Sequence, residues 1–139
     1  MSQNLYHRDI IDEISKYLDT NDIIVLHGAR QVGKTSILYY IKERLDKRGD
    51  STYYVDLEDS RYLKILDAGI SEFIKHLKEE GFSTDKRLFV FIDEIQYLDD
   101  PSSFLKLIAD HQKWLKLVIS GSSSFDMKKK FKDSLVGRT

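Results

Sequence analysis

Apolar residues are grouped along the chain in two kinds of block, and the two kinds alternate. Short unbroken apolar runs are typical of buried strands. Four such runs occur: IIVLH (23–27), TYYVDL (52–57), RLFVFIDE (87–94) and LKLVIS (115–120). The other blocks carry apolar residues three or four positions apart, which predicts amphipathic helices. These blocks cover 5–18, 36–47, about 70–81, a stretch opened by Pro101, and about 123–136.

Strands alternating with helices predict right-handed βαβ units, and hence an α/β fold with a parallel sheet between two layers of helices. The 139 residues fit one domain, and 41% hydrophobic with 32% charged residues indicates a compact soluble protein. The net charge of −1 selects neither nucleic acid nor a membrane surface. There is no cysteine, no signal-peptide pattern and no long apolar span. We therefore expect a cytoplasmic protein.

The stretch GARQVGKT (28–35) fits the pattern G-x-x-x-x-G-K-[ST] at each fixed position, between a predicted strand and a predicted helix. Such a loop turns backbone N–H groups toward phosphates at the positive end of the helix. Lys34 would then contact the β- and γ-phosphates, and the Thr35 hydroxyl would bind Mg²⁺. The predicted nucleotide-binding residues are Gly28, Ala29, Arg30, Gln31, Val32, Gly33, Lys34, Thr35 and Ser36. Within the loop, an Arg30 side chain exposed to solvent is the alternative to one that faces phosphate.

The third apolar run ends in two carboxylates that complete the predicted site. Asp93 would hold Mg²⁺, through a bound water. Glu94 would orient a water and accept its proton, which indicates hydrolysis rather than phosphoryl transfer to a substrate. No Asn-Lys-x-Asp element follows a late strand, so adenine is preferred to guanine.

Other polar residues have both a functional and a local interpretation. Ser120, or else Ser122, would reach the γ-phosphate or the water, although Ser-Gly clusters also form turns and helix caps. Arg138 would stabilise charge on the γ-phosphate, or is a surface arginine. Asp56 and Glu58 would assist the metal, or cap the following turn.

Five motifs together carry a family resemblance: LHGARQVGKTS, YYVDLED, FVFIDEIQ, LVISGSSS and LVGRT. From about residue 20 to the end, the chain resembles the AAA-type P-loop ATPase domain of a large prokaryotic predicted-ATPase family. Alanine stands at position 29 where the family commonly has proline. The resemblance implies a three-layer αβα fold of the additional-strand type, with strand order 5-1-4-3-2, and it makes Gln96 part of the signature.

Full-length members of that family resemble fusions of the ATPase to a C-terminal nuclease-like domain. We accordingly expect residues 1–139 to be a truncated P-loop domain, with an N-terminal helix (1–20) and a nucleotide-binding core (21–139). The fifth strand is expected to be missing, which would leave the first strand at the sheet edge and lower stability. The expected partners are ATP and, for the chain itself, a second copy or the C-terminal domain. DNA would have to bind the lysines near residue 130, which instead fit a solvated helix face.

The leading functional hypothesis is Mg²⁺-dependent ATP hydrolysis, with Lys34, Glu94, Ser120 and Arg138 as catalytic residues and with Thr35 and Asp93 as metal ligands. The alternative is an ATP-binding switch with little turnover of its own, acting through a partner. A nucleotide kinase is less favoured, because no arginine-rich lid is visible and Glu94 points to water.

Overall fold

Five parallel strands form the centre of the computed structural model, which describes residues 11–27, 33–122 and 134–136. The strands are β1 (Ile24–His27), β2 (Ser51–Asp56), β3 (Leu88–Asp93), β4 (Leu115–Gly121) and β5 (Ser134–Val136). Their order in the sheet is β2-β3-β4-β1-β5, and each neighbouring pair is parallel. The predicted α/β class and strand order 5-1-4-3-2 are confirmed.

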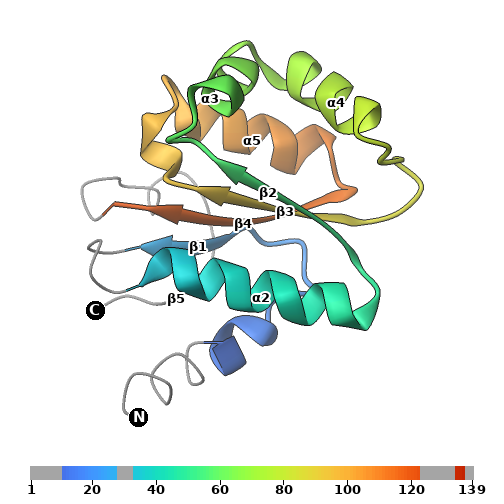
Figure 1. Ribbon diagram of the computed structural model, residues 1–139, viewed down its shortest axis with the longest axis vertical. Coiled ribbons are helices and arrows are strands. Elements are labelled where there is room, and N and C mark those ends of the chain that lie inside the picture. Colours follow the sequence, from blue (N-terminus) through green and yellow to red (C-terminus); the bar gives the residue numbers. More distant parts are fainter. Residues whose placement is uncertain (1–10, 28–32, 123–133, 137–139) are drawn as a thin grey trace.

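Helices cover both faces of this sheet (Figure 1). They are α2 (Lys34–Arg48), α3 (Ser60–Asp67), α4 (Ile70–Glu79) and α5 (Pro101–His111), with a short 3-10 helix, η2 (Ile95–Tyr97), after β3. Helix α2 and the N-terminal segment lie on one face, whereas α3, α4 and α5 lie on the other. Successive strand residues point into the hydrophobic cores on opposite faces of the sheet. Ile24 and Leu26 pack with α2, and Val25 packs with α3 to α5.

The expectation of a missing fifth strand is wrong. The backbone of Ser134–Val136 pairs in parallel with β1, in the register Ile24 to Ser134 and Leu26 to Val136. Strand β1 is therefore an interior strand of the sheet, and the premise for an exposed β1 edge does not hold. An unpaired parallel edge offers a row of backbone donors and acceptors, and the three residues of β5 pair with three of the four residues of β1.

The predicted final helix over about 123–136 is wrong at its end, because 134–136 form β5. The four-residue spacing that predicted it joins Met127, Phe131 and Leu135. Pairing with β1 overrides that weak periodicity in the described part of the segment. Residues 123–133, including the lysine-rich stretch considered for DNA, lie outside the described residues.

Two helices, not one, connect β2 and β3. Helix α3 was not predicted, because it is only eight residues long and buries Leu66 alone in full. A signal for it was nevertheless present in the sequence: the Asp59 carboxylate caps the helix by accepting a hydrogen bond from the Arg61 backbone N–H. Helix α4 occupies the predicted 70–81 segment, with Phe73 and Leu77 buried.

The N-terminal helix is described from Ile11, and residues 11–15 are helical before a series of turns. Ile11, Ile14 and Leu18 are buried against the α2 side of the sheet, as the predicted amphipathic face requires. Within the described parts of the chain, none of the helices is long and apolar enough to cross a bilayer.

Candidate functional site

The carboxyl ends of the parallel strands meet the start of α2 at one edge of the sheet. The strand arrows of β2, β3, β4 and β1 end on the same side in Figure 1, where α2 begins. The register places Asp56 beside Asp93, Ile92 beside Ile119, and Leu26 beside Ser120. Residues from four strands therefore lie at the edge of the sheet where α2 begins, in the crevice where open parallel sheets bind ligands.

Helix α2 begins directly after a left-handed glycine. Gly33 has φ 74° and ψ 36°, a conformation that glycine adopts without the steric penalty of a Cβ. Lys34 follows in the first turn of α2 and is only 4% exposed, so its side chain is buried within the site. Residues 28–32 of the predicted phosphate loop, Gly28 to Val32, lie outside the described residues. The described part of the motif thus starts at a helix N-terminus, the positive end of the helix dipole.

Asp93 is the centre of the site, because three hydroxyl groups donate to its carboxylate. Thr35 Oγ1 donates to Oδ2 at 2.8 Å, and Tyr54 Oη donates to the same oxygen at 2.6 Å. Ser120 Oγ donates to the other oxygen, Oδ1. Asp93 is 4% exposed, so these bonds compensate the carboxylate for much of its lost hydration. The three donors come from α2, β2 and β4, which fixes the carboxylate from three directions.

The pair Thr35 and Asp93 fits a Mg²⁺ ion. A threonine hydroxyl that donates its proton to a carboxylate keeps its oxygen lone pairs for a hard cation. A carboxylate has about four acceptor positions, and three hydroxyl donors leave one for a metal-bound water. Among the described residues no cluster of three or more acidic or histidine ligands exists, so an all-protein metal cage is not what this arrangement offers.

Ser120 connects Asp93 to Glu94. Its side chain is 0% exposed, and besides donating to Asp93 its Oγ accepts the Glu94 backbone N–H at 2.9 Å. One buried hydroxyl thus fixes a carboxylate and the neighbouring main chain together. The described side-chain hydrogen bonds of Ser120 are with these two residues, which gives it a positioning role. Contact with a γ-phosphate or a water stays a prediction.

Glu94 has an unusual backbone conformation at the end of β3. Its φ of 62° and ψ of 56° make it the one non-glycine residue with positive φ among the described residues. Such a conformation costs a non-glycine residue about 1–2 kcal/mol, so surrounding contacts must hold it. The bend leads directly into η2, and Gln96 there donates from Nε2 to Glu94 Oε1 at 2.6 Å. Gln96 Oε1 in turn accepts from the Ser122 backbone N–H at 3.1 Å, linking the ends of β3 and β4.

Tyr54 belongs to the site, although it was not among the site residues predicted from the sequence. Burial, and then its hydrogen bond to Asp93, raises the pKa of Tyr54, so the hydroxyl keeps its proton and donates at neutral pH. The ring of Tyr39 from α2 stacks on Tyr54, with centroids 4.5 Å apart and planes at 9°. The sequence signals were its place in the motif YYVDLED and its position two residues before Asp56, on a strand that ends at the site.

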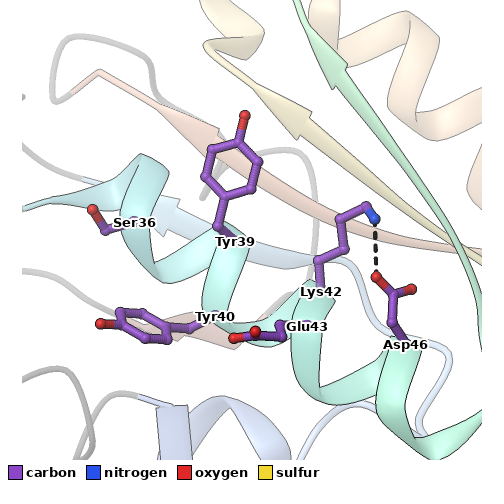
Figure 2. Close-up of a pocket in the computed structure, with 6 residues that line it drawn as sticks. All are labelled: Ser36, Tyr39, Tyr40, Lys42, Glu43 and Asp46. Atoms are coloured by element: carbon purple, nitrogen blue, oxygen red, sulfur yellow. Dashed lines mark hydrogen bonds and ion pairs between the residues drawn. The ribbon is translucent and has the colours of Figure 1, made fainter.

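The other predicted residues divide into two groups. Asp56 Oδ1 accepts from the Glu58 backbone N–H at 2.9 Å, which is the local turn role, and Glu58 is exposed. Ser36 is exposed in the first turn of α2 and lines a hollow of about 470 Å³ along that helix (Figure 2). Arg138 and Arg30 lie outside the described residues, and their proposed contacts with phosphate stay predictions.

Comparisons with known proteins agree with this architecture. A curated protein of Haemophilus influenzae, described as "Uncharacterized protein", is 26% identical over 103 residues, covering 71% of this chain and 25% of its own length. The chain thus spans about a quarter of the length of that relative. "Structure of Drosophila ORC bound to DNA" aligns with a TM-score of 0.61 at 18% identity, covering 99% of this chain and 93% of the other. "Structure of C. elegans PCH-2" aligns with a TM-score of 0.59 at 19% identity, covering 95% and 39%.

The two structural similarities, at these identities, show the fold alone. The family model described as "AAA domain" matches residues 20–139, which include the glycine loop, β3 with its two carboxylates, and β4. Fusion to a nuclease-like domain stays a prediction. This chain belongs to the AAA domain family, whose P-loop architecture implies ATP binding and hydrolysis.

Proposed function

We propose that this chain is a Mg²⁺-dependent ATPase whose site is the crevice around Asp93. The observation that carries the proposal is the hydrogen bond of 2.8 Å between Thr35 Oγ1 and Asp93 Oδ2, which joins residues 58 positions apart. It brings the end of the glycine loop motif and the end of the acidic strand into one site, with the groups that Mg²⁺ and a triphosphate require.

Each residue of the crevice would make a separate contribution. Residues 28–33 would surround the phosphates with backbone N–H groups, and Lys34 would add a positive charge. Thr35 and Asp93 would hold the Mg²⁺ ion, which when bound supplies positive charge against the phosphate oxygens. Glu94, whose carboxylate lies at the same strand end, would orient the attacking water and accept its proton.

The test is the substitution Glu94→Gln, which keeps the shape of the side chain and removes its basicity. We expect ATP affinity to change little and steady-state phosphate release to fall about 100-fold or more, the scale of a lost general base. Binding is measured with a fluorescent ATP analogue and turnover by phosphate release. Glu79→Gln, at the exposed end of α4, makes the same chemical change away from the crevice and serves as the control.

Two results would contradict the proposal at different levels. Phosphate release that survives in Glu94→Gln would remove the role given to Glu94 while leaving the site intact. Failure of the wild-type protein to bind ATP in the presence of Mg²⁺ would remove the proposed function itself.

A second candidate function, the ATP-binding switch, is favoured by one observation. Gln96 donates to Glu94 Oε1 at 2.6 Å, so one carboxylate oxygen is already engaged by the protein rather than by a water. In a switch, this engagement would persist and the bound ATP would be hydrolysed slowly. Repeated turnovers in the phosphate-release assay support the enzyme, and tight binding with at most one slow turnover supports the switch.

A further inference from the structure

Tyr54 reaches the centre of the site from β2, a strand that contributes neither the phosphate loop nor the acidic pair. Its hydroxyl donates to Asp93 Oδ2 at 2.6 Å, and its half-buried ring is stacked on Tyr39 of α2. Thr35 donates to the same oxygen. A tyrosine hydroxyl therefore shares one carboxylate oxygen with the hydroxyl proposed to bind Mg²⁺.

We infer that Tyr54 is a positioning residue for the Mg²⁺ site, and that Tyr39 supports it by holding its ring. The inference rests on the proposed function, since it concerns how Asp93 meets the metal. It assigns to Tyr54, within the motif YYVDLED, a role beside the metal in addition to the one considered for Asp56.

The hydrogen-bond acceptor positions of the Asp93 carboxylate determine where a metal-bound water can bind. Each carboxylate oxygen accepts about two hydrogen bonds. Oδ2 of Asp93 receives two, from Thr35 and Tyr54, so the described contacts fill that oxygen. Oδ1 receives one, from Ser120, and keeps the position suited to a metal-bound water. Without the Tyr54 hydroxyl, both oxygens would have room for a water, and the carboxylate would no longer be held in a single orientation.

Helix α2 contributes two residues to the positioning of the Asp93 carboxylate, Thr35 and Tyr39. Thr35 and Tyr39 are four residues apart, so they project from neighbouring turns of one helix face. Thr35 donates a hydrogen bond to Asp93, whereas Tyr39 stacks on Tyr54, which donates to Asp93. Figure 2 shows the Tyr39 and Tyr40 rings leaving α2 in different directions, and the stacking distance of 4.5 Å shows that Tyr39 is the one on Tyr54. Tyr39 remains 53% exposed, so burial of its own surface does not explain its position.

The alternative is that the hydrogen bond only satisfies a partly buried hydroxyl. The neighbouring Tyr53 provides a matched control, because successive strand residues point to opposite faces. Tyr53 packs on the α3–α5 side, and its hydroxyl shares a hydrogen bond of 2.6 Å with His76 Nε2. Tyr53→Phe therefore removes a hydroxyl of equal bond length, on the same strand, without touching Asp93.

The experiment measures the affinity for a fluorescent ATP analogue in Mg²⁺ and in EDTA, together with the melting temperature. The ratio of the two affinities is the gain due to Mg²⁺. We expect Tyr54→Phe to lower this gain roughly three- to tenfold, the scale of the net contribution of one ordinary hydrogen bond, with the EDTA affinity unchanged. Tyr53→Phe should leave the gain as in the wild type. Tyr39→Leu, which keeps the Tyr54 hydroxyl but removes the stacked ring, should give a smaller decrease.

The outcomes separate the inference from the proposed function. A wild-type protein whose affinity does not rise with Mg²⁺ overturns both. A normal gain that Tyr54→Phe retains, or an equal loss in Tyr53→Phe, overturns the inference alone. If Tyr54→Phe does not fold, Tyr39→Leu decides the matter: a reduced gain at wild-type EDTA affinity supports the inference, and an unchanged gain overturns it.

Discussion

Strand β4 carries a buried polar side chain at each end, and the two ends differ in what they hold. Lys116, near the amino end, is 1% exposed, and Ser120, at the carboxyl end, is 0% exposed. The two residues are four positions apart, so they share the strand face that packs with α2. Lys116 at the amino end forms hydrogen bonds to the turn before β1, whereas Ser120 at the carboxyl end forms a hydrogen bond to the Asp93 carboxylate.

At the amino end, a cation meets neutral oxygens of the same chain. Lys116 Nζ donates to Thr20 Oγ1 at 3.1 Å and to the backbone carbonyl of Asp22. Arg87, just before β3, donates to the Thr20 carbonyl and to Asn21 Oδ1. These bonds fix the turn that leads into β1, and hence the position of the strand before the glycine loop.

At the carboxyl end, hydroxyl groups converge on Asp93 and Ser120 also holds the Glu94 backbone. Neutral hydroxyl donors hold the carboxylate in one orientation, which suits a site that receives a cation. Burial of a polar group therefore does not by itself identify a ligand site. What distinguishes the carboxyl end is a carboxylate that hydroxyl groups from three elements hold in place.

Lys34→Ala should have the largest effect on ATP binding at the carboxyl end of the sheet. The positive charge that Lys34 would offer to the phosphates would be lost, and ATP affinity should fall about 100-fold or more, as expected for charge-assisted hydrogen bonds. Lys47→Ala, exposed in the last turn of the same helix, should bind ATP normally. Equilibrium titration with the fluorescent analogue measures both. Equal affinities in the two variants would show that the start of α2 is not the phosphate site.

Ser120→Ala should affect both stability and activity. Removing a fully buried hydroxyl leaves the Glu94 N–H and one Asp93 oxygen without their partner, at a cost of about 1–3 kcal/mol in the free energy of unfolding. Phosphate release should fall as well, because both acidic residues lose their restraint. Urea denaturation and the phosphate assay test this. Ser71→Ala, exposed on α4, is the control, and normal turnover in Ser120→Ala would mean that the link between the two acidic residues is structural only.

Lys116→Met should have the smallest effect, and it should change stability without changing ATP binding. It keeps the apolar stem and removes the donor to Thr20 and Asp22, so we expect the free energy of unfolding to fall by about 1 kcal/mol. ATP affinity of the folded protein should not change. Urea denaturation and binding titration measure the two quantities, and weaker ATP binding at unchanged stability would show that the amino end contributes to the site.

The fold was largely predictable because its signals are local. Each interior strand corresponds to an unbroken apolar run, and α2, α4 and α5 correspond to apolar spacing at helical period. Strand order came from the family resemblance rather than from the pattern itself. The errors lie where local signals are weak: α3 buries one residue fully, and β5 is a three-residue segment whose conformation depends on the β1 edge beside it.

The site was predictable as a pair of motifs but not as a set of contacts. By itself, the sequence determined that a glycine loop with Lys34 and Thr35 precedes a helix and that Asp93 and Glu94 end a buried strand, because such motifs consist of neighbouring residues. The tertiary structure alone decided that Thr35, Tyr54 and Ser120 donate to one carboxylate. Those contacts span 58, 39 and 27 positions, so they depend on strand register and helix packing, which residue spacing along the chain does not encode.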